Sequence, residues 1–169
     1  FRQDGELHVR TCSARHGGGL YLSTDKVEQG KSATALVEDC SAEEDGGGPY
    51  ISEFSAGEIS LLGRLEFRNC SAGGRGGGIF IAGKDGEFMA REMHFHHCRA
   101  TREGGAFFAE RMSQLDHVTL KHCDSGGSGA VTVYGDVTVS DLTVATDADT
   151  KGQAIMSGGA PVVESLNCT

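Results

Sequence analysis

The most constraining feature of this sequence is a repeat that runs along almost its whole length. The clearest copy, LEFRNCSAGGRGGGIFIA, begins at Leu65 and joins an alternating stretch, a cysteine, a glycine run and a second apolar stretch. Aligned on the cysteine, the copies follow one another at intervals of 19 to 30 residues. The aligned column is Cys12, Cys40, Cys70, Cys98, Cys123, Leu142 and Cys168, in which Leu142 replaces the cysteine. This period is too short for helical ankyrin or tetratricopeptide repeats, and the spacing of leucine-rich repeats is absent.

Each copy has the residue pattern of strands rather than helices. In Leu65-Glu66-Phe67-Arg68, apolar and charged residues alternate, which is typical of a half-buried strand. Because a unit this short cannot bury its apolar side alone, successive copies must stack on one another. We therefore predict an all-β fold, a parallel β-helix (β-solenoid) of about seven coils, as a single domain over residues 1–169. The glycines, 26 in all against 2 prolines, then serve sharp turns and the close approach of stacked backbones.

The composition argues against several classes of partner. A net charge of −9 disfavours nucleic acid, because phosphate binding requires clustered Lys and Arg. No apolar run approaches the roughly 18 residues of a membrane-spanning helix, so we predict no transmembrane segment. The chain opens on Phe1 and closes at Thr169 within a repeat, and we interpret it as a processed or partial piece of a longer protein.

The pattern F-x-N-C-S-A-x-x-x-G-G-G-I-F-I-A resembles the repeats of the polymorphic outer-membrane proteins, whose copies carry F-x-x-N and G-G-A-I elements. Two departures are visible. Phe67 stands two residues before Asn69 rather than three, and Cys70 follows where the family has a small or polar residue. The family is similar to the wider group of right-handed parallel β-helices, which includes pectin-cleaving enzymes and autotransporter passengers. The resemblance implies a right-handed winding, a role in adhesion or surface display, and an extracellular, cell-surface or organelle-lumen location.

The cysteines face inward in the strand alternation and form a predicted structural ladder. Its members are Cys12, Cys40, Cys70, Cys98, Cys123 and Cys168. The thiols either pack as small, soft hydrophobes or form disulfides between adjacent coils, such as Cys12 with Cys40, where the Cα atoms lie within bonding range. There is no C-x-x-C motif, and ligands in a straight column make a poor tetrahedron, so we predict no metal and no cofactor.

Two polar ladders are predicted beside the cysteines. Opposite charges on the outward face should pair across coils, and polar side chains at the turn should hydrogen-bond along the stack. The outward ladder is Arg10, Glu38, Arg68, His96, Lys121 and Ser140. The turn ladder is Thr11, Asp39, Asn69, His97, His122, Asp141 and Asn167. The two stacked histidines with Asp141 offer a metal alternative, although the alternation directs the other histidines away.

The second strand of each copy is apolar on both faces, so both faces should be covered. Its middle position is aromatic in four copies, and such a row suits the centre of an interface or stacking on sugars. We predict partner-binding residues at Tyr21, Tyr50, Phe80 and Phe108. Thr132 and Met156 continue this column. The alternative is that linkers such as residues 53–63 fold over the row.

No catalytic constellation is visible, so we predict no catalytic residues. The glycine run is not a P-loop, because no Gly-Lys-Ser/Thr follows it. Glu38 and Glu66 stand singly on the outward face rather than as a converging pair of carboxylates. We expect a non-catalytic structural or binding scaffold that presents a lateral sheet face to a protein or glycan partner, as an accessory subunit of a larger assembly. The alternative is a polysaccharide lyase or glycoside hydrolase of the β-helix type.

Overall fold

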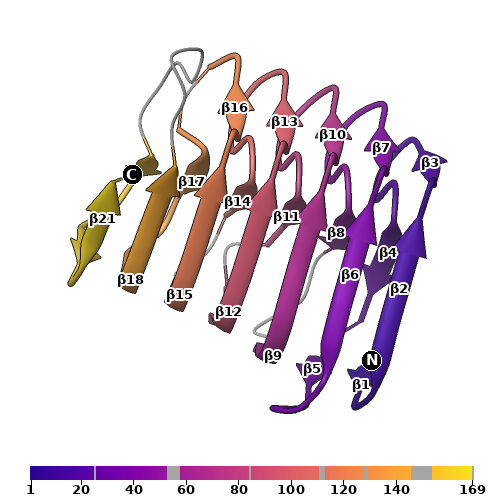
Figure 1. Ribbon diagram of the computed structural model, residues 1–169, viewed down its shortest axis with the longest axis horizontal. Helices are drawn as coiled ribbons and strands as arrows, with labels where there is room; N and C mark the ends of the chain where they lie inside the picture. The colour runs from indigo at the N-terminus through magenta and orange to yellow at the C-terminus, as the bar shows by residue number, and fades with distance from the viewer. Residues whose placement is uncertain are drawn as a thin grey trace.

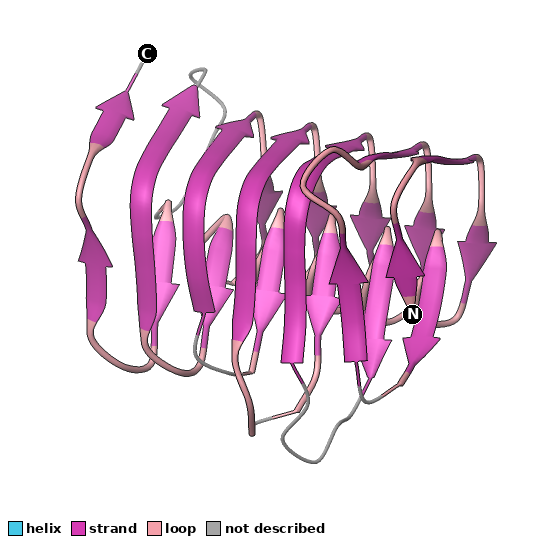
Figure 2. Ribbon diagram, turned by 90° about the horizontal axis from the view of Figure 1, so that it is seen from below, coloured by secondary structure: helices cyan, strands magenta, loops and turns pink. Residues whose placement is uncertain are grey.

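The structure is a computed structural model that describes residues 1–24, 26–52, 58–83, 85–110, 113–127, 129–145 and 154–168. Across these residues every regular element is a strand, and strands of successive turns pair in parallel to form three sheets (Figure 1, Figure 2). In Figure 1 the strands of one sheet rise in front and those of another descend behind them as the chain advances, which is a right-handed winding. The predicted all-β parallel solenoid is confirmed. The described residues include no helix that could cross a membrane.

The first sheet, here called the long sheet, contains ten strands. In the first two turns and the last it is made of two short strands, whereas one long strand spans each turn between them. Its strands are β1 (Arg2–Gln3), β2 (Glu6–Arg10), β5 (Lys26–Gln29), β6 (Thr34–Glu38), β9 (Glu58–Arg68), β12 (Phe88–His96), β15 (Ser113–Lys121), β18 (Val137–Ala145), β20 (Pro161–Val163) and β21 (Leu166–Cys168). Buried and more exposed residues alternate along β9, as the period of two predicts.

Two smaller sheets complete each turn. The short sheet contains β3 (Ser13–Ala14), β7 (Ser41–Ala42), β10 (Ser71–Ala72), β13 (Arg99–Ala100) and β16 (Asp124–Ser125). The third sheet contains β4 (Leu20–Ser23), β8 (Pro49–Ser52), β11 (Ile79–Ile81), β14 (Phe107–Ala109), β17 (Val131–Val133) and β19 (Ile155–Ser157). Within the described residues, strands of all three sheets occur in five successive turns. The expectation of about seven coils was therefore too high, because the last turns contribute strands to only part of the coil.

Each of the five turns leaves the long sheet through one residue in the left-handed conformation, and none of these residues is glycine. Their φ angles lie between 51° and 53°, at Thr11, Asp39, Asn69, His97 and His122. Their side chains interact along the column: Asn69 Nδ2 donates to Asp39 Oδ1 at 3.1 Å, and the rings of His97 and His122 stack 4.7 Å apart. These five positions of the turn ladder are confirmed. Asp141 and Asn167 are wrong, because they lie within strands β18 and β21.

The glycine run forms the next corner, and two of its positions admit no side chain. Gly76 has a φ of +66°, and a Cβ there would lie 2.5 Å from the carbonyl oxygen of Ile79. A Cβ on Gly77 would lie 2.1 Å from the carbonyl oxygen of Gly105 in the next turn. The backbones of adjacent turns therefore approach too closely there for any other residue, and the run belongs to the architecture of the coil.

The alignment of the sixth copy was wrong, because its register differs from the predicted one. Leu142 pairs with Val118, five residues before Cys123, so Leu142 is not in the cysteine position. Lys121 pairs with Ala145, so Ser140 is not in the outward ladder. The cysteine-equivalent position of this turn lies outside the described residues. The two alignments differ by five residues: the prediction set the Val-Thr-Val that begins at Val137 against the similar Val-Thr-Leu that begins at Val118, whereas Val137 pairs with Ser113.

Five of the six cysteines occupy equivalent positions, each two residues after a paired end of the long sheet. They are Cys12, Cys40, Cys70, Cys98 and Cys123. Cys168 does not belong with them, because it pairs with Val144 and is exposed in β21. All six are free thiols, including the pairs considered as disulfides. The Sγ of Cys40 donates to the carbonyl of Glu38 at 3.2 Å, and burial raises the pKa of this thiol to about 11, so it is a neutral packing group.

Part of the linker considered as a cover for the aromatic row is a strand. Residues 53–57 lie outside the described residues, and Glu58 begins β9 of the long sheet. Ile59 and Leu61 are buried in the hydrophobic core of the coil. The linker alternative is therefore wrong for residues 58–63.

Candidate binding surface

The outer face of the third sheet carries four stacked aromatic rings, here called the aromatic row. The row is Tyr21, Tyr50, Phe80 and Phe108, which pair with one another across β4, β8, β11 and β14. Successive ring centroids lie 5.2, 4.9 and 5.1 Å apart, with interplanar angles of 4°, 10° and 2°. The flanking aliphatic residues belong to the core of the coil instead. The parallel register thus turns a sequence column into a continuous stack of rings.

Exposure falls sharply along the aromatic row. Tyr21 is 56% exposed and Tyr50 is half-buried, whereas Phe80 and Phe108 are 1% and 0% exposed. The two phenylalanines form a small core of their own with Ala82. A partner that approaches this face meets the two tyrosines but not the phenylalanines. Partner binding by the four residues stays a prediction, and burial confines it to the tyrosine half of the row.

Arg75 covers the buried half of the row. Its Cζ lies 5.0 Å from the ring centroid of Phe80 and 4.8 Å from that of Phe108, within cation–π range. Its terminal nitrogens pair with Asp45 at 3.3 Å and with Glu110 at 3.5 Å. Burial opposes the charge of Arg75, but the hydrogen bond and charge of Asp45, together with Glu110, outweigh it, so the pKa of Arg75 is raised. The guanidinium is therefore a fixed, charged strap across the two rings.

Arg75 belongs to a column that the sequence reasoning missed. The residue before the glycine run is His16, Asp45, Arg75 and Glu103 in successive turns. The ring of His16 lies 5.1 Å from that of Tyr50, so this column borders the whole row. The alternation of basic and acidic residues immediately before each glycine run was the signal that could have revealed it.

Tyr134 closes the C-terminal end of the row and was also missed. Its ring meets Phe108 edge-on, with centroids 5.1 Å apart and an angle of 74°. Its hydroxyl donates to the carboxylate of Glu103, with the two oxygens at 2.8 and 3.1 Å. Because Tyr134 follows a strand and stands outside the column of middle positions, the repeat alignment gave it no role.

The outward face of the long sheet pairs charges both across and along its strands. Arg10 reaches Glu38 in the next turn at 3.0 Å, as the outward ladder predicts. Arg68 instead hydrogen-bonds Glu66 on its own strand at 2.7 Å. His96 lies 3.8 Å from the same carboxylate. Pairing across turns is therefore confirmed for the first pair, whereas Arg68 finds its partner within the strand.

The pKa values of two carboxylates on the outward face of the long sheet bear on whether this face could supply a catalytic acid. Burial would raise the pKa of Glu66, but the hydrogen bond and charge of Arg68 outweigh it, so that pKa is lowered. The hydrogen bond to His94, 2.8 Å long, lowers the pKa of Glu92 against a smaller effect of burial. A glycosidase acid needs a raised pKa instead. In the part of the chain that the structure describes, no group of three or more His, Cys, Asp or Glu could hold a metal ion.

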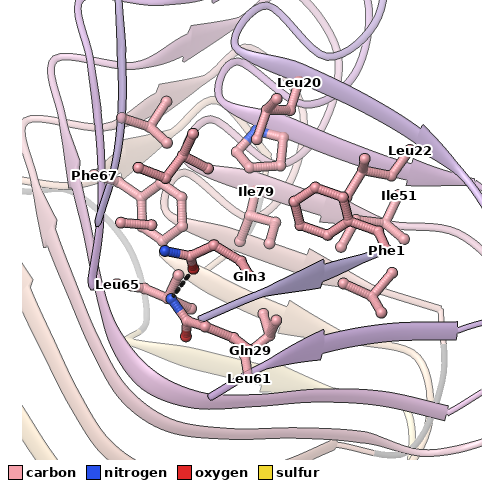
Figure 3. A pocket seen from close by; sticks show the side chains of 15 residues that line it. Phe1, Gln3, Leu20, Leu22, Gln29, Ile51, Leu61, Leu65, Phe67 and Ile79 are labelled. Atoms are coloured by element: carbon pink, nitrogen blue, oxygen red, sulfur yellow. Dashed lines mark hydrogen bonds between the residues drawn. The ribbon is translucent and has the colours of Figure 1, made fainter. Parts of the chain in front are cut away.

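Figure 3 shows a small apolar cavity inside the first turns, with a volume of about 50 Å³. Aliphatic and aromatic side chains such as Ile51 and Phe67 line it. Its polar side chains satisfy each other, because Gln29 Nε2 donates to Gln3 Oε1 at 2.8 Å. The backbone N–H of Gly63 donates to Gln29 Oε1 at 3.1 Å. The cavity is therefore a feature of core packing rather than a ligand site.

Fold and surface together define a parallel β-solenoid with an aromatic row on one outer face and paired charged side chains on another. Scans against protein-family models, curated proteins and solved structures each found no match. The resemblance to the repeats of polymorphic outer-membrane proteins therefore rests on the residues of the repeat alone.

Proposed function

We propose that this protein is a non-catalytic binding scaffold that uses the outer face of the third sheet to hold a protein or glycan partner. The observation that carries the proposal is the open end of the aromatic row, where Tyr21 is 56% exposed and Tyr50 is half-buried. Both rings are fixed by stacking on a buried continuation of the same row. Rigid aromatic anchors on a fixed framework lose little entropy on binding and commonly dominate interface energetics.

The orientation of the rings favours a protein over a glycan at this face. Both faces of Tyr50 are occupied by Tyr21 and Phe80, so a lateral approach meets mainly its edge and hydroxyl group, while Tyr21, at the end of the row, stacks on Tyr50 with one face. Sugars stack on aromatic faces, whereas protein side chains pack on edges as well. Beside the tyrosines, Arg15 pairs with Glu44 at 2.7 Å and His16 with the same carboxylate at 3.2 Å. These exposed ion pairs would form the polar rim of an apolar contact.

The resemblance of the repeat extends the proposal to adhesion or surface display, with an extracellular, cell-surface or organelle-lumen location. A polysaccharide lyase or glycoside hydrolase is the competing function. The lowered pKa values of Glu66 and Glu92 argue against either carboxyl as the general acid of a glycoside hydrolase, because that group must hold its proton.

The test compares the wild-type chain with Tyr21→Ser and Tyr50→Ser for retention of partners from the native source, identified by mass spectrometry. We expect each substitution to weaken retention of the same partner by about tenfold or more, with the fold intact by circular dichroism. Met89→Ser, at a residue that is 39% exposed on the long sheet, is the matched control and should retain the partner. Cleavage of a polysaccharide that disappears in Glu66→Gln would overturn the proposal in favour of the enzyme.

A further inference from the structure

A second surface feature lies beyond the covered end of the aromatic row. It is a groove of about 550 Å³, a volume within the range of small-molecule sites. Its lining residues are Arg75, Thr101, Arg102, Glu103, Gly126, Gly127 and Tyr134. The aromatic row itself does not line it, so the groove is separate from the tyrosine end of the row.

Two glycines keep the groove hollow. Gly126 and Gly127 follow Thr101 and Arg102 in the next turn of the coil. A Cβ on Gly126 would lie 2.2 Å from the carbonyl oxygen of Thr101, and one on Gly127 would lie 2.4 Å from that of Arg102. The stacked backbones therefore exclude side chains at both positions. The depression follows from the close approach of the turns and does not depend on side-chain conformation.

Tyr134 provides this groove with a fixed aromatic platform. It is 49% exposed, and its hydroxyl is anchored on Glu103 at 2.8 Å. The ring meets Phe108 at 74° and so does not continue the parallel stack. Its faces are therefore not shared between two parallel neighbours, unlike those of Tyr50 and Phe80. An anchored, half-exposed ring of this kind is suited to packing against the C–H face of a sugar.

Both hydrogen-bond donors and hydrogen-bond acceptors lie around the ring of Tyr134. Arg102 is exposed and offers donors, while the half-buried carboxylate of Glu103 offers acceptors. The buried Nε of Arg75 has no hydrogen-bond partner, although its terminal nitrogens pair with Asp45 and Glu110. The two cations are thus matched by three carboxylates, so the groove carries no surplus positive charge for an anion. Neutral hydroxyl groups, each a donor and an acceptor, fit this mixture.

We propose that this groove binds a neutral saccharide, whose apolar face packs on Tyr134 and whose hydroxyls bond to Arg102 and Glu103. This inference goes beyond the proposed function, because it assigns a ligand to a different site. Binding at one site does not require the other, and the two proposals fail separately.

The experiment is a titration of the isotope-labelled chain with neutral oligosaccharides of glucose, mannose, galactose and N-acetylglucosamine, followed by amide chemical shifts. We expect at least one of them to give saturable shifts of the Gly126 and Gly127 amides at millimolar concentration. Tyr134→Ala and Arg102→Ala should each weaken that binding by about tenfold. Tyr134→Phe, which keeps the ring, should bind within a few-fold of wild type, and Tyr21→Ser should bind unchanged.

Three results would overturn the proposal. They are the absence of saturable shifts with every neutral sugar, binding of oligogalacturonate alone, or neutral-sugar binding that survives Tyr134→Ala. Thermal unfolding of each variant separates a lost contact from a lost fold, and the expected weakening in Arg102→Ala supplies the readout if Tyr134→Ala unfolds. Partner retention in the Tyr21 and Tyr50 variants tests the proposed function independently.

Discussion

The two halves of the aromatic row have the same register and nearly the same ring spacing but opposite relations to solvent. At the N-terminal half, Tyr21 is 56% exposed, and at the other half Phe108 is 0% exposed. The difference does not come from the sheet, which continues without a break from β4 to β14. Instead, Arg75, held between Asp45 and Glu110, lies over the two phenylalanines, and Tyr134 packs edge-on against Phe108. A column on a solenoid face can thus be surface in one turn and core two turns later.

The largest loss of stability should come from truncating a buried ring in the phenylalanine half of the aromatic row. Phe108→Ala removes a ring that is 0% exposed, so we expect a loss of about 3–5 kcal/mol in the free energy of unfolding, measured by urea denaturation. Met156→Ala is the control, because Met156 continues the same column but is 40% exposed, and should cost less than about 1 kcal/mol. Equal losses in the two variants would break the distinction between covered and open positions.

Replacing Arg75, which covers the rings of Phe80 and Phe108, should have an intermediate effect on the free energy of unfolding. Arg75→Ala uncovers two rings and leaves Asp45 and Glu110 without their cation, so we expect a loss of about 1–2 kcal/mol by the same measurement. Arg10→Ala breaks an ion pair whose arginine side chain is 63% exposed and should cost about 0.5 kcal/mol or less. If Arg75→Ala is as mild as Arg10→Ala, the cover is not what separates the two halves.

Tyr50 lies between the exposed and the buried ends of the aromatic row, and its partial burial should make the stability of the folded protein depend on pH in alkaline solution. Burial, with a smaller contribution from Tyr21, raises the pKa of Tyr50. The folded state then holds this proton more tightly than the unfolded state. Its contribution to stability is therefore full below the unfolded pKa of about 10 and is lost as the pH rises through the folded pKa. Thermal unfolding should show wild type losing more stability than Tyr50→Phe above that pH, and parallel curves would contradict this prediction.

The smallest loss of stability should come from a substitution at Tyr21, the exposed end of the aromatic row. Tyr21→Ser removes one stacked contact with Tyr50 from a side chain that is already 56% exposed. We expect a loss of no more than about 1 kcal/mol in the free energy of unfolding, measured by urea denaturation. A loss comparable to that of Phe108→Ala would place Tyr21 in the core and remove it from the candidate surface.

Much of the fold was predictable because stacking repeats a local pattern. The alternation around Phe67 and the cysteine after each turn identified strands, corners and register through five turns. The prediction failed in β18, where Leu142 was assigned to the cysteine column. That strand is followed by no cysteine in the described residues, and its opening Val-Thr-Val resembles the Val-Thr-Leu that precedes Cys123, so the two were aligned although Val137 pairs with Ser113.

The candidate surface was less predictable than the fold. The row itself followed from the middle positions of the second strands, but its cover did not. Arg75, Glu110 and Tyr134 come from different turns and different parts of the coil, and only the wound chain brings them together over Phe80 and Phe108. A single sequence reports which face a residue occupies, whereas burial depends on which long side chains reach across from neighbouring turns.

The parallel pairing of each strand only with the equivalent strands before and after it has a mechanical consequence. Every strand of the third sheet hydrogen-bonds in the sheet only to its immediate neighbours, so each turn is stabilised mainly by the turns before and after it. Phe108→Ala should therefore weaken the contact between neighbouring turns, so that the turns C-terminal to it unfold while the N-terminal turns stay folded. The tyrosines at the far end would remain in place, and melting would lose its single cooperative step.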